Sequence, residues 1–555
     1  MMITILACQL WVSDSTYGPR VAGRLYIHSS TASIGGLVPD VPVHRAGDSV
    51  TIALPDSQGE FRGTVDPDGR IGGFWVQARG LVSGVRYATP VTLYTPGKGA
   101  YFSIGELRPL EEHYRLYMRS TPDSGVTFRV PERNYLGGQG YARYIMQPDG
   151  DSIRFVDTTH TFPSFSGHRV GDRITMHWPG LDMPVTLRPA TRRETAEYYP
   201  RPPGSKYTYR VPKRMPDDWR IGRARDVGID EAALAAIVQH IGSTDPVSRT
   251  APLIQSLLIA RHGRLVLDEY FFGFDADRLH DLRSASKTFT SVMVGAAHVD
   301  MNTPLYAALG DPQPDRSRIT VGHALTHSTG LACDDNDDDS PGNEDKMYTQ
   351  TGQLDWYRFI LELPVAHDPG TVYAYCSGGI NLALGVVART TNTWLPAFFA
   401  KSVAEPLGIH RWAMNLMPTG DGYGGGGLYL RPRDLLKLGV AYLDSGVWHG
   451  ASYLDDGRWK SQRIVSADWV RQSTAKQIVT GTDTWDGYGW HLNILHAPGR
   501  DYHDYEATGN GGQLLIVVPD LDLAVVFTAA NYNRYPIWRT FRDSITATQI
   551  IPAVH

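Results

Sequence analysis

The sequence predicts a protein of two domains, an N-terminal all-β barrel or sandwich and a C-terminal domain in which helices pack on a sheet. The chain has 555 residues, more than one hydrophobic core usually organises. Short β-like runs separated by turn residues fill its first third, and helical and strand patterns alternate after that. We therefore expect domains at residues 1–190 and 220–555, joined by a linker over 191–219.

The N-terminal domain is predicted from alternating runs bounded by turn chemistry. These runs include Gly23–Ile27, Val50–Leu54, Glu60–Val65, Gly73–Val76, Tyr114–Met118, Val126–Val130 and Arg173–Trp178. Asp66-Pro67-Asp68-Gly69 and Pro148-Asp149-Gly150 are typical hairpin turns. Many short strands with frequent turns favour a barrel or sandwich, and no motif in this region indicates what it does.

The extreme N-terminus, Met1 to Cys8, ends in Ile-Leu-Ala-Cys, which is similar to the lipid-attachment box of bacterial lipoproteins. It lacks the positively charged lead and the full apolar stretch of a signal peptide. We expect a first β-strand here, with a truncated signal as the alternative. A cytoplasmic and a periplasmic location both stay open.

Composition excludes several classes of partner. The formal net charge is −5, from 53 basic and 58 acidic residues, and no basic patch is interleaved with aromatic residues. Nucleic acid is therefore not an expected partner. No run of about 18 apolar residues could span a bilayer. The three cysteines, Cys8, Cys333 and Cys376, are too few and too irregularly spaced for a disulfide framework or a zinc site.

The linker and the start of the C-terminal domain follow from local patterns. Arg192–Trp219 is rich in Pro, Arg and Tyr, which suits an extended connector. Asp230 is a typical N-cap for a helix through Val238. The runs Ser256–Ile259 and Leu265–Tyr270 flank a Gly-containing turn and predict a hairpin.

Ser284-Ala285-Ser286-Lys287 stands directly before an apolar run with helical spacing. Residues three apart share a helix face, so Lys287 can reach the Ser284 hydroxyl and act as its base if burial or a cationic neighbour keeps it neutral. The alternative is an ordinary helix start with a solvated lysine. A second Ser-x-x-Lys at Ser473 precedes a strand-like stretch, and we interpret it as chance.

Two other signals carry no site prediction. Asp334–Asp339 lacks the glycine and the final glutamate of a calcium loop, so we expect a solvated acidic loop near the mouth of an active site. Gly424–Gly427 has no following Gly-Lys-Ser/Thr and is not a phosphate loop.

Further phrases follow Ser284 and Lys287 in order: Leu325–Leu331 with its Thr-His-Ser-Thr-Gly, Tyr373–Gly379, Gly424–Leu428 and Asn510–Gln513. Together they resemble the serine β-lactamase and penicillin-recognising superfamily. The branch is that of class C β-lactamases, family VIII carboxylesterases, 6-aminohexanoate-oligomer hydrolases and D-amino-acid peptidases. The resemblance covers roughly Trp219 to the C-terminus and implies a β-lactamase-like α/β (α+β) domain with an antiparallel sheet.

Carried over to this chain, the resemblance makes Ser284 the acylated nucleophile, Lys287 its partner, and Tyr375 the tyrosine of a Tyr-x-Asn motif. A phenol with a pKa of about 10 can act as a base if a lysine cation stabilises the phenolate. Tyr373 is the competing occupant of this short motif. Ser377 replaces the motif's asparagine and lacks its amide donors.

The family's third motif, Lys-Thr-Gly or His-x-Gly, corresponds here to Asn510-Gly511-Gly512. The implied oxyanion donors are the backbone N–H groups of Ser284 and Gln513. No cation stands in the third motif, so we expect substrates without the β-lactam carboxylate. Arg431 or Arg433 could supply a charge from elsewhere, and the glycines could instead be a simple hairpin turn.

The resemblance implies a serine hydrolase that cleaves a small ester or a peptide-like amide through an acyl-enzyme, without a metal or organic cofactor. The alternatives are a peptidase or amidase for D-amino-acid or non-ribosomal peptides, a β-lactamase, and a penicillin-recognising sensor without turnover. The expected partner is a small-molecule or peptide substrate.

Overall fold

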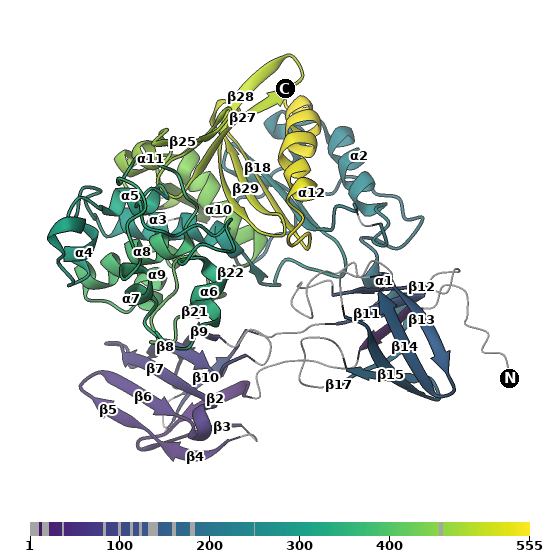
Figure 1. The fold of residues 1–555 in the computed structure, drawn as a ribbon, viewed down its shortest axis with the longest axis horizontal. Coiled ribbons are helices and arrows are strands. Elements are labelled where there is room, and N and C mark those ends of the chain that lie inside the picture. Colours follow the sequence, from purple (N-terminus) through teal and green to yellow (C-terminus); the bar gives the residue numbers. More distant parts are fainter. Residues whose placement is uncertain are drawn as a thin grey trace.

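The computed structural model describes residues 10–13, 21–35, 38–80, 85–97, 102–110, 115–120, 125–130, 143–157, 163–177, 184–248, 250–453 and 459–555. The strand expected over Met1–Cys8 lies outside these residues. The described chain forms an N-terminal β region and a C-terminal domain of sheet and helices (Figure 1). The predicted fold class is confirmed.

Part of the N-terminal region is a closed barrel of eight antiparallel strands. In order around the barrel they are β1 (Leu10–Ser13), β11 (Tyr117–Ser120), β12 (Gly125–Arg129), β13 (Arg143–Asp149), β14 (Ser152–Asp157), β15 (Phe165–Val170), β16 (Arg173–His177) and β17 (Pro184–Pro189). Alternate residues point inward, as in β16, where Ile174 and Met176 are buried. Edge-to-face and stacked rings, including Phe128, Phe155 and Phe165, fill the interior.

The rest of the N-terminal strands form a second β unit with a separate hydrophobic core. One sheet has the order β10 (Ser103–Leu107), β2 (Gly23–Ile27), β3 (Thr31–Ile34) and β4 (Val38–Pro42). The strands β9 (Arg86–Leu93), β8 (Ile71–Gln77), β7 (Gly59–Val65), β6 (Ser49–Ala53) and β5 (His44–Ala46) belong to another sheet. That sheet continues through β21 (Trp412–Leu416), β22 (Leu428–Leu430) and β20 (His280–Asp281) of the C-terminal domain. Figure 1 shows this unit directly below the helices of that domain, apart from the barrel.

The C-terminal domain is built on an eight-stranded antiparallel sheet. Its order is β19 (Arg264–Tyr270), β18 (Ile254–Arg261), β30 (Leu523–Ala529), β29 (Gln513–Val518), β28 (Arg500–Gly509), β27 (His491–Ala497), β26 (Thr484–Asp486) and β25 (Ile478–Gly481). Both faces are buried. In β29, Leu515 and Val517 belong to the core that includes helix α10 (Pro432–Leu443), while Leu514 and Ile516 belong to the core that includes helix α2 (Glu231–Gly242).

The remaining elements pack on this sheet or on one another (Figure 1), and one strand pair forms a separate two-stranded sheet. They include α3 (Ser286–Ala296), α4 (Leu305–Ala308), α5 (Val321–Leu325), α6 (Glu344–Thr349), α7 (Trp356–Leu361), α8 (Ser377–Thr391), α9 (Leu395–Phe399), α11 (Ala467–Ser473), α12 (Tyr535–Thr540), the helical segment η7 (Phe541–Ile550), and the strand pair β23 (Val447–Tyr453) and β24 (Trp459–Arg463). As expected, the Asp230 side chain caps α2, accepting hydrogen bonds from the N–H groups of Ala232 and Ala233. No helix in the described part of the chain is both long and apolar enough to cross a membrane.

The connector expected to be extended begins instead with a short helix, α1 (Arg192–Tyr198). Thr191 and Glu194 form a capping box in which each side chain accepts the other's backbone N–H. The three-residue spacing of Thr191 and Glu194 is visible in the sequence and is typical of a helix start. The Pro- and Arg-rich composition of the segment favoured an extended connector instead.

Candidate active site

The candidate nucleophile lies in a tight turn between strand and helix. β20 ends at Asp281, Ser284 lies in the short helical turn η3 (Arg283–Ala285), and α3 follows at once. Arg283 has a φ of 50°, a conformation that non-glycine residues seldom adopt. Its N–H donates to the Asp281 carboxylate at 3.0 Å, which holds this turn in place. The strained residue thus stands immediately before the serine, as is frequent at active sites.

Lys287 lies one helical turn after Ser284 and reaches it. Its ammonium donates to Ser284 Oγ at 2.9 Å and to the carbonyl of Gly425 at 2.7 Å. Lys287 is buried, and burial by itself lowers the pKa of its side chain. The neighbouring Tyr375 and the carboxylates of Glu344 and Asp335 outweigh burial and hold that pKa above its ordinary value. The lysine is therefore a cation in the resting site, not the neutral base that the sequence analysis considered.

Tyr375 contacts both members of the pair. The Lys287 Nζ lies 4.8 Å from the centre of the Tyr375 ring. Burial raises the pKa of the phenol, while the Lys287 cation and side-chain hydrogen bonds with Lys287 and Ser284 lower it in part. The competing Tyr373 instead shares a hydrogen bond with Asp486. Of the two tyrosines, Tyr375 is the one in contact with Ser284 and Lys287.

Two histidines that the sequence analysis did not single out lie against Tyr375. The ring of His327 is 4.5 Å from the Tyr375 ring, and its Nδ1 accepts the N–H of Cys376 at 3.0 Å. Burial lowers the pKa of His327 to about 3, so it is neutral. The ring of His491 is 6.5 Å away and pairs with Asp486 at 2.7 Å. His327 belongs to the Leu325–Leu331 phrase, and the place of this phrase among the family motifs could have indicated that His327 lies near the site.

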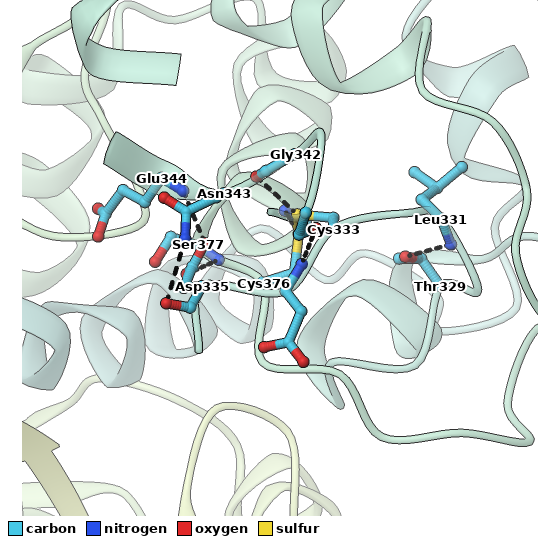
Figure 2. Close-up of a disulfide and its surroundings, with 12 residues drawn as sticks. Thr329, Leu331, Cys333, Asp335, Gly342, Asn343, Glu344, Cys376 and Ser377 are labelled. Carbon is cyan, nitrogen blue, oxygen red and sulfur yellow. Dashed lines mark hydrogen bonds between the residues drawn. A yellow bond between two sulfur atoms is a disulfide. The ribbon is translucent and has the colours of Figure 1, made fainter. Parts of the chain in front are cut away.

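A disulfide between Cys333 and Cys376 joins the two loops that border the site (Figure 2). The spacing of the three cysteines predicted no disulfide framework, and this crosslink corrects that expectation. The two Cα atoms lie 5.4 Å apart although 43 positions separate the residues in the chain. Cys376 directly follows Tyr375, so the crosslink fixes the backbone beside the candidate proton-transfer group.

Asp335, two residues after Cys333, ties the same loops together (Figure 2). Its carboxylate accepts the N–H of Ser377 at 2.7 Å and the N–H of Glu344 at 2.9 Å. Burial and the nearby Glu344 raise the pKa of Asp335 to about 6. Near neutral pH it is an anion close to Lys287, and it stabilises the lysine cation.

Ser377, predicted to replace an asparagine at the substrate, is fully buried at the start of α8. It lies outside the lining of the cavity beside Ser284, which instead includes Tyr375. In the structure, Ser377 contributes its backbone N–H to Asp335.

Only the first residue of the predicted third motif, Asn510, lines the cavity beside Ser284. The cavity is lined by Thr508, Gly509 and Asn510, whereas Gly511, Gly512 and Gln513, all within the described residues, lie outside its lining. The Gln513 side-chain amide donates to the Ala529 carbonyl at 2.7 Å inside the sheet.

The strand edge beside the nucleophile is the end of β28. At Gly509 a Cβ atom would lie 2.1 Å from the carbonyl oxygen of Leu282 and 3.2 Å from the backbone nitrogen of Ala285. Only glycine permits this close approach. The close approach puts the edge at Thr508–Asn510 next to the turn of Ser284, and Gln513 pairs with Gly509 on the neighbouring strand β29.

The cavity beside Ser284 has a volume of about 1100 Å³. Arg431 and Arg433, suggested as possible cations, do not line it, because they are buried in ion pairs with Asp434 at 2.6 Å and with Asp217 at 2.5 Å. The arginines that do line it are Arg283, Arg539 and Arg542. The lining also includes residues of three other segments, which are the glycine run, the acidic loop and the second β unit of the N-terminal region. These residues are Gly425, Gly426, Gly427, Asp335, Asn336, Val85 and Tyr87.

The second Ser-x-x-Lys is structural. Ser473 is buried and donates to the carbonyl of Val470, and Lys476 lies over the ring of Trp485. Among the described residues, no group of three or more His, Cys, Asp and Glu side chains is arranged to hold a metal ion.

An antiparallel sheet flanked by helices, with a Ser-x-x-Lys turn beside a strand edge, defines a β-lactamase-like protein. The sequence model of the beta-lactamase family matches residues 255–536, just over half of the chain. The chain belongs to this family, and its strand-rich N-terminal region lies outside the match.

Individual relatives are distant. The 6-aminohexanoate-dimer hydrolase of Paenarthrobacter ureafaciens is 25% identical over an alignment of 302 residues that covers 49% of this chain and 71% of that protein. A penicillin-binding protein from Bacillus halodurans is 16% identical with a TM-score of 0.42, covering 56% of this chain and 98% of its own. A family VIII carboxylesterase is 17% identical with a TM-score of 0.43, covering 58% of this chain and 94% of its own.

Proposed function

We propose that this protein is a serine hydrolase that cleaves small esters or peptide-like amides through an acyl-enzyme on Ser284. The observation that carries the proposal is the 2.9 Å hydrogen bond from Lys287 to Ser284, with Tyr375 in contact with both, on the wall of a cavity of about 1100 Å³. A nucleophile, a proton-transfer group and space for a substrate therefore meet at one point.

The reaction follows from this geometry. Ser284 Oγ attacks the substrate carbonyl, and its proton passes to the pair formed by Tyr375 and Lys287. The oxyanion is held by the Ser284 N–H and by an N–H of the Thr508–Asn510 edge, which takes the place first given to Gln513. The pair returns the proton to the departing alcohol or amine, and water then releases the acyl group by the same steps.

In the resting site both Lys287 and Tyr375 have raised pKa values and hold their protons. The pair must lose one proton before it can accept one from Ser284. Because the two groups are in contact, this loss belongs to the pair and not to either residue alone.

Chemical labelling and turnover test the proposal. A fluorophosphonate should leave its adduct on the peptide containing Ser284, and Ser284→Ala should abolish both the adduct and the hydrolysis of p-nitrophenyl acetate. Ser473→Ala is the matched control, since it removes the serine of the other Ser-x-x-Lys. An adduct on Ser286 or Ser473 would contradict the assignment. Labelling without turnover would favour the non-catalytic sensor.

The cavity favours substrates without a carboxylate, because each of the three described arginines that line it already forms an ion pair with an acidic residue of the protein. Arg283 pairs with Asp281 at 3.7 Å, Arg542 with Glu506 at 3.0 Å, and the exposed Arg539 with Asp543 at 2.9 Å. A neutral ester should therefore have a higher kcat/KM than nitrocefin. If nitrocefin were preferred by about tenfold, a difference of about 1.4 kcal/mol, the β-lactamase alternative would replace the esterase.

A second candidate, an amidase for substrates with a free amino group, is favoured by Glu506. This cavity-lining residue is only 3% exposed, and its Oε1 accepts from Arg542 at 3.0 Å. Among the described residues no donor reaches its Oε2, which leaves a buried carboxyl oxygen to accept from the ammonium group of a substrate. D- and L-aminoacyl anilides should then be cleaved faster than their N-acetyl derivatives, and Glu506→Gln should remove the difference. Equal rates would reject this candidate.

A further inference from the structure

The second β unit of the N-terminal region, strands β2 to β10, is called here the N-terminal β unit. It is continuous with the catalytic domain through a shared sheet. β9 pairs with β21 in antiparallel register, joining Tyr87 to Asn415 and Ala88 to Met414. β21 pairs with β22, and β22 pairs with β20, which leads into the turn of Ser284. Two sequence regions more than three hundred residues apart thus form one structural element (Figure 1). A separately tethered recognition module would not share backbone hydrogen bonds with the catalytic domain in this way.

Residues of this unit reach the cavity itself. Val85 and Tyr87 line it together with Tyr348 and Asn415 of the catalytic domain. Val85 is partly exposed, so it can touch a substrate, whereas Tyr87 is 1% exposed and serves as its support. The Asn415 side chain donates to the Tyr348 hydroxyl at 3.1 Å, which fixes the neighbouring part of the wall.

Tyr87 also connects this wall to the nucleophile. Its ring packs edge-to-face on Tyr429 at 5.4 Å, and the Tyr429 hydroxyl donates to the Asp281 carboxylate at 3.2 Å. Asp281 in turn accepts the N–H of Arg283, the residue before Ser284. A displacement of β9 would therefore move both the cavity wall at Tyr87 and the turn that holds Ser284.

The wall at Val85 and Tyr87 is apolar and aromatic and adjoins Tyr348. Other parts of the lining carry charge or further aromatic rings, and they include Asp335, Glu344, Glu506, Trp485 and Trp538. An apolar group of the substrate that lies against Val85 gains about fourfold in affinity per buried methylene. We propose that the N-terminal β unit is the substrate-selecting wall of the catalytic cavity, with Val85 as the residue that contacts an apolar acyl or alcohol group. This rests on the proposed function and assigns a role to a region outside the family match.

The test compares substrates of increasing size on Val85→Trp, which narrows the cavity. Thr92→Trp is the matched control, because Thr92 is exposed on β9, the strand that directly follows Val85, and does not line the cavity. The substrates are p-nitrophenyl acetate, p-nitrophenyl hexanoate and 1-naphthyl acetate. Val85→Trp should raise KM about tenfold or more for at least one of the two larger esters, with kcat nearly unchanged and p-nitrophenyl acetate within about twofold. Thr92→Trp should follow the wild type on all three.

An equal loss on all three esters, or no change on any of them, would overturn the proposal. Val85→Ala guards against a folding defect: it removes the apolar contact without narrowing the cavity, so it should raise KM by about fourfold or more for the ester that Val85→Trp rejects and leave p-nitrophenyl acetate near the wild type. Binding separates this proposal from the proposed function. Calorimetry with Ser284→Ala should detect N-hexanoyl anilide more tightly bound than N-acetyl anilide, and adding Val85→Trp should remove the difference. If the protein binds the hexanoyl compound selectively but the wild type shows no turnover, the proposed hydrolase function is wrong and the proposed role of the wall stands. If Val85→Trp leaves the binding preference unchanged, the proposed role of the wall is wrong.

Discussion

Removing the Cys333–Cys376 disulfide should weaken both the stability of the catalytic domain and its activity. The crosslink closes a loop over a sequence separation of 43 residues. In the chain-entropy description, releasing a loop of this size lowers the free energy of unfolding by up to about 4 kcal/mol. That is a large share of the roughly 5–15 kcal/mol by which most domains are stable.

The effect on activity follows from where the crosslink lies. Cys376 is bonded to Tyr375, and Cys333 lies two residues before Asp335, so loosening the crosslink frees both loops. Small displacements of a proton-transfer group cost up to about a hundredfold in rate. We expect kcat for p-nitrophenyl acetate to fall about tenfold or more in a Cys333→Ser/Cys376→Ser double variant.

The assay combines urea unfolding with steady-state kinetics, with and without a phosphine reductant. Cys8→Ser is the control, because it removes a thiol but keeps the disulfide. The double variant should be insensitive to the reductant, and the wild type should approach it after reduction. A double variant with wild-type kcat and an unfolding free energy within about 0.5 kcal/mol of the wild type would refute the reasoning.

Three further predictions concern the reacting groups. Lys287→Ala and Tyr375→Phe should each lower kcat about two decades or more, the scale of a lost acid–base group, and wild-type turnover in either would remove that residue from the mechanism. Because the pKa values of Lys287 and Tyr375 are both raised, kcat/KM for a neutral ester should rise with pH through the alkaline range. The Asp335 anion raises both pKa values, so Asp335→Asn should move this rise to lower pH, and an unmoved profile would contradict the assignment. Gly509→Ala, whose Cβ would lie 2.1 Å from a backbone carbonyl oxygen, should lower kcat/KM about tenfold or more, unlike Gly72→Ala, where the added Cβ meets nothing within 4 Å.

Features set by short stretches of chain could be predicted from the sequence. Ser284 and Lys287 lie within one helical turn, so their spacing alone indicated the contact that the structure has at 2.9 Å. The same holds for the cap at Asp230 and for the alternating strands of the N-terminal region. In each case the deciding interactions lie only a few positions apart.

Features that depend on distant segments could not be predicted in this way. The pairing of Cys333 with Cys376 and of β9 with β21 depends on how separate regions pack, and neither has a local signature. The third motif was aligned by its glycines, but the close approach of Gly509 to Leu282 shows that the strand before the turn borders the serine. The role considered for Arg433 failed because its buried partner, Asp217, is over two hundred residues away in the chain.

The electrostatics of the site link these distant segments to the chemistry. Lys287 is buried and yet remains a cation because Tyr375, followed by the carboxylates of Glu344 at the start of α6 and Asp335 in the acidic loop, opposes the cost of burial. The same cation is what lowers the pKa of Tyr375 against its own burial. The charge on Lys287 thus makes Tyr375 a better base, and the acidic loop helps to keep Lys287 charged. The disulfide and the hydrogen bonds of Asp335 hold that loop, so the crosslink at Cys376 and the proton transfer at Ser284 depend on one arrangement of the chain.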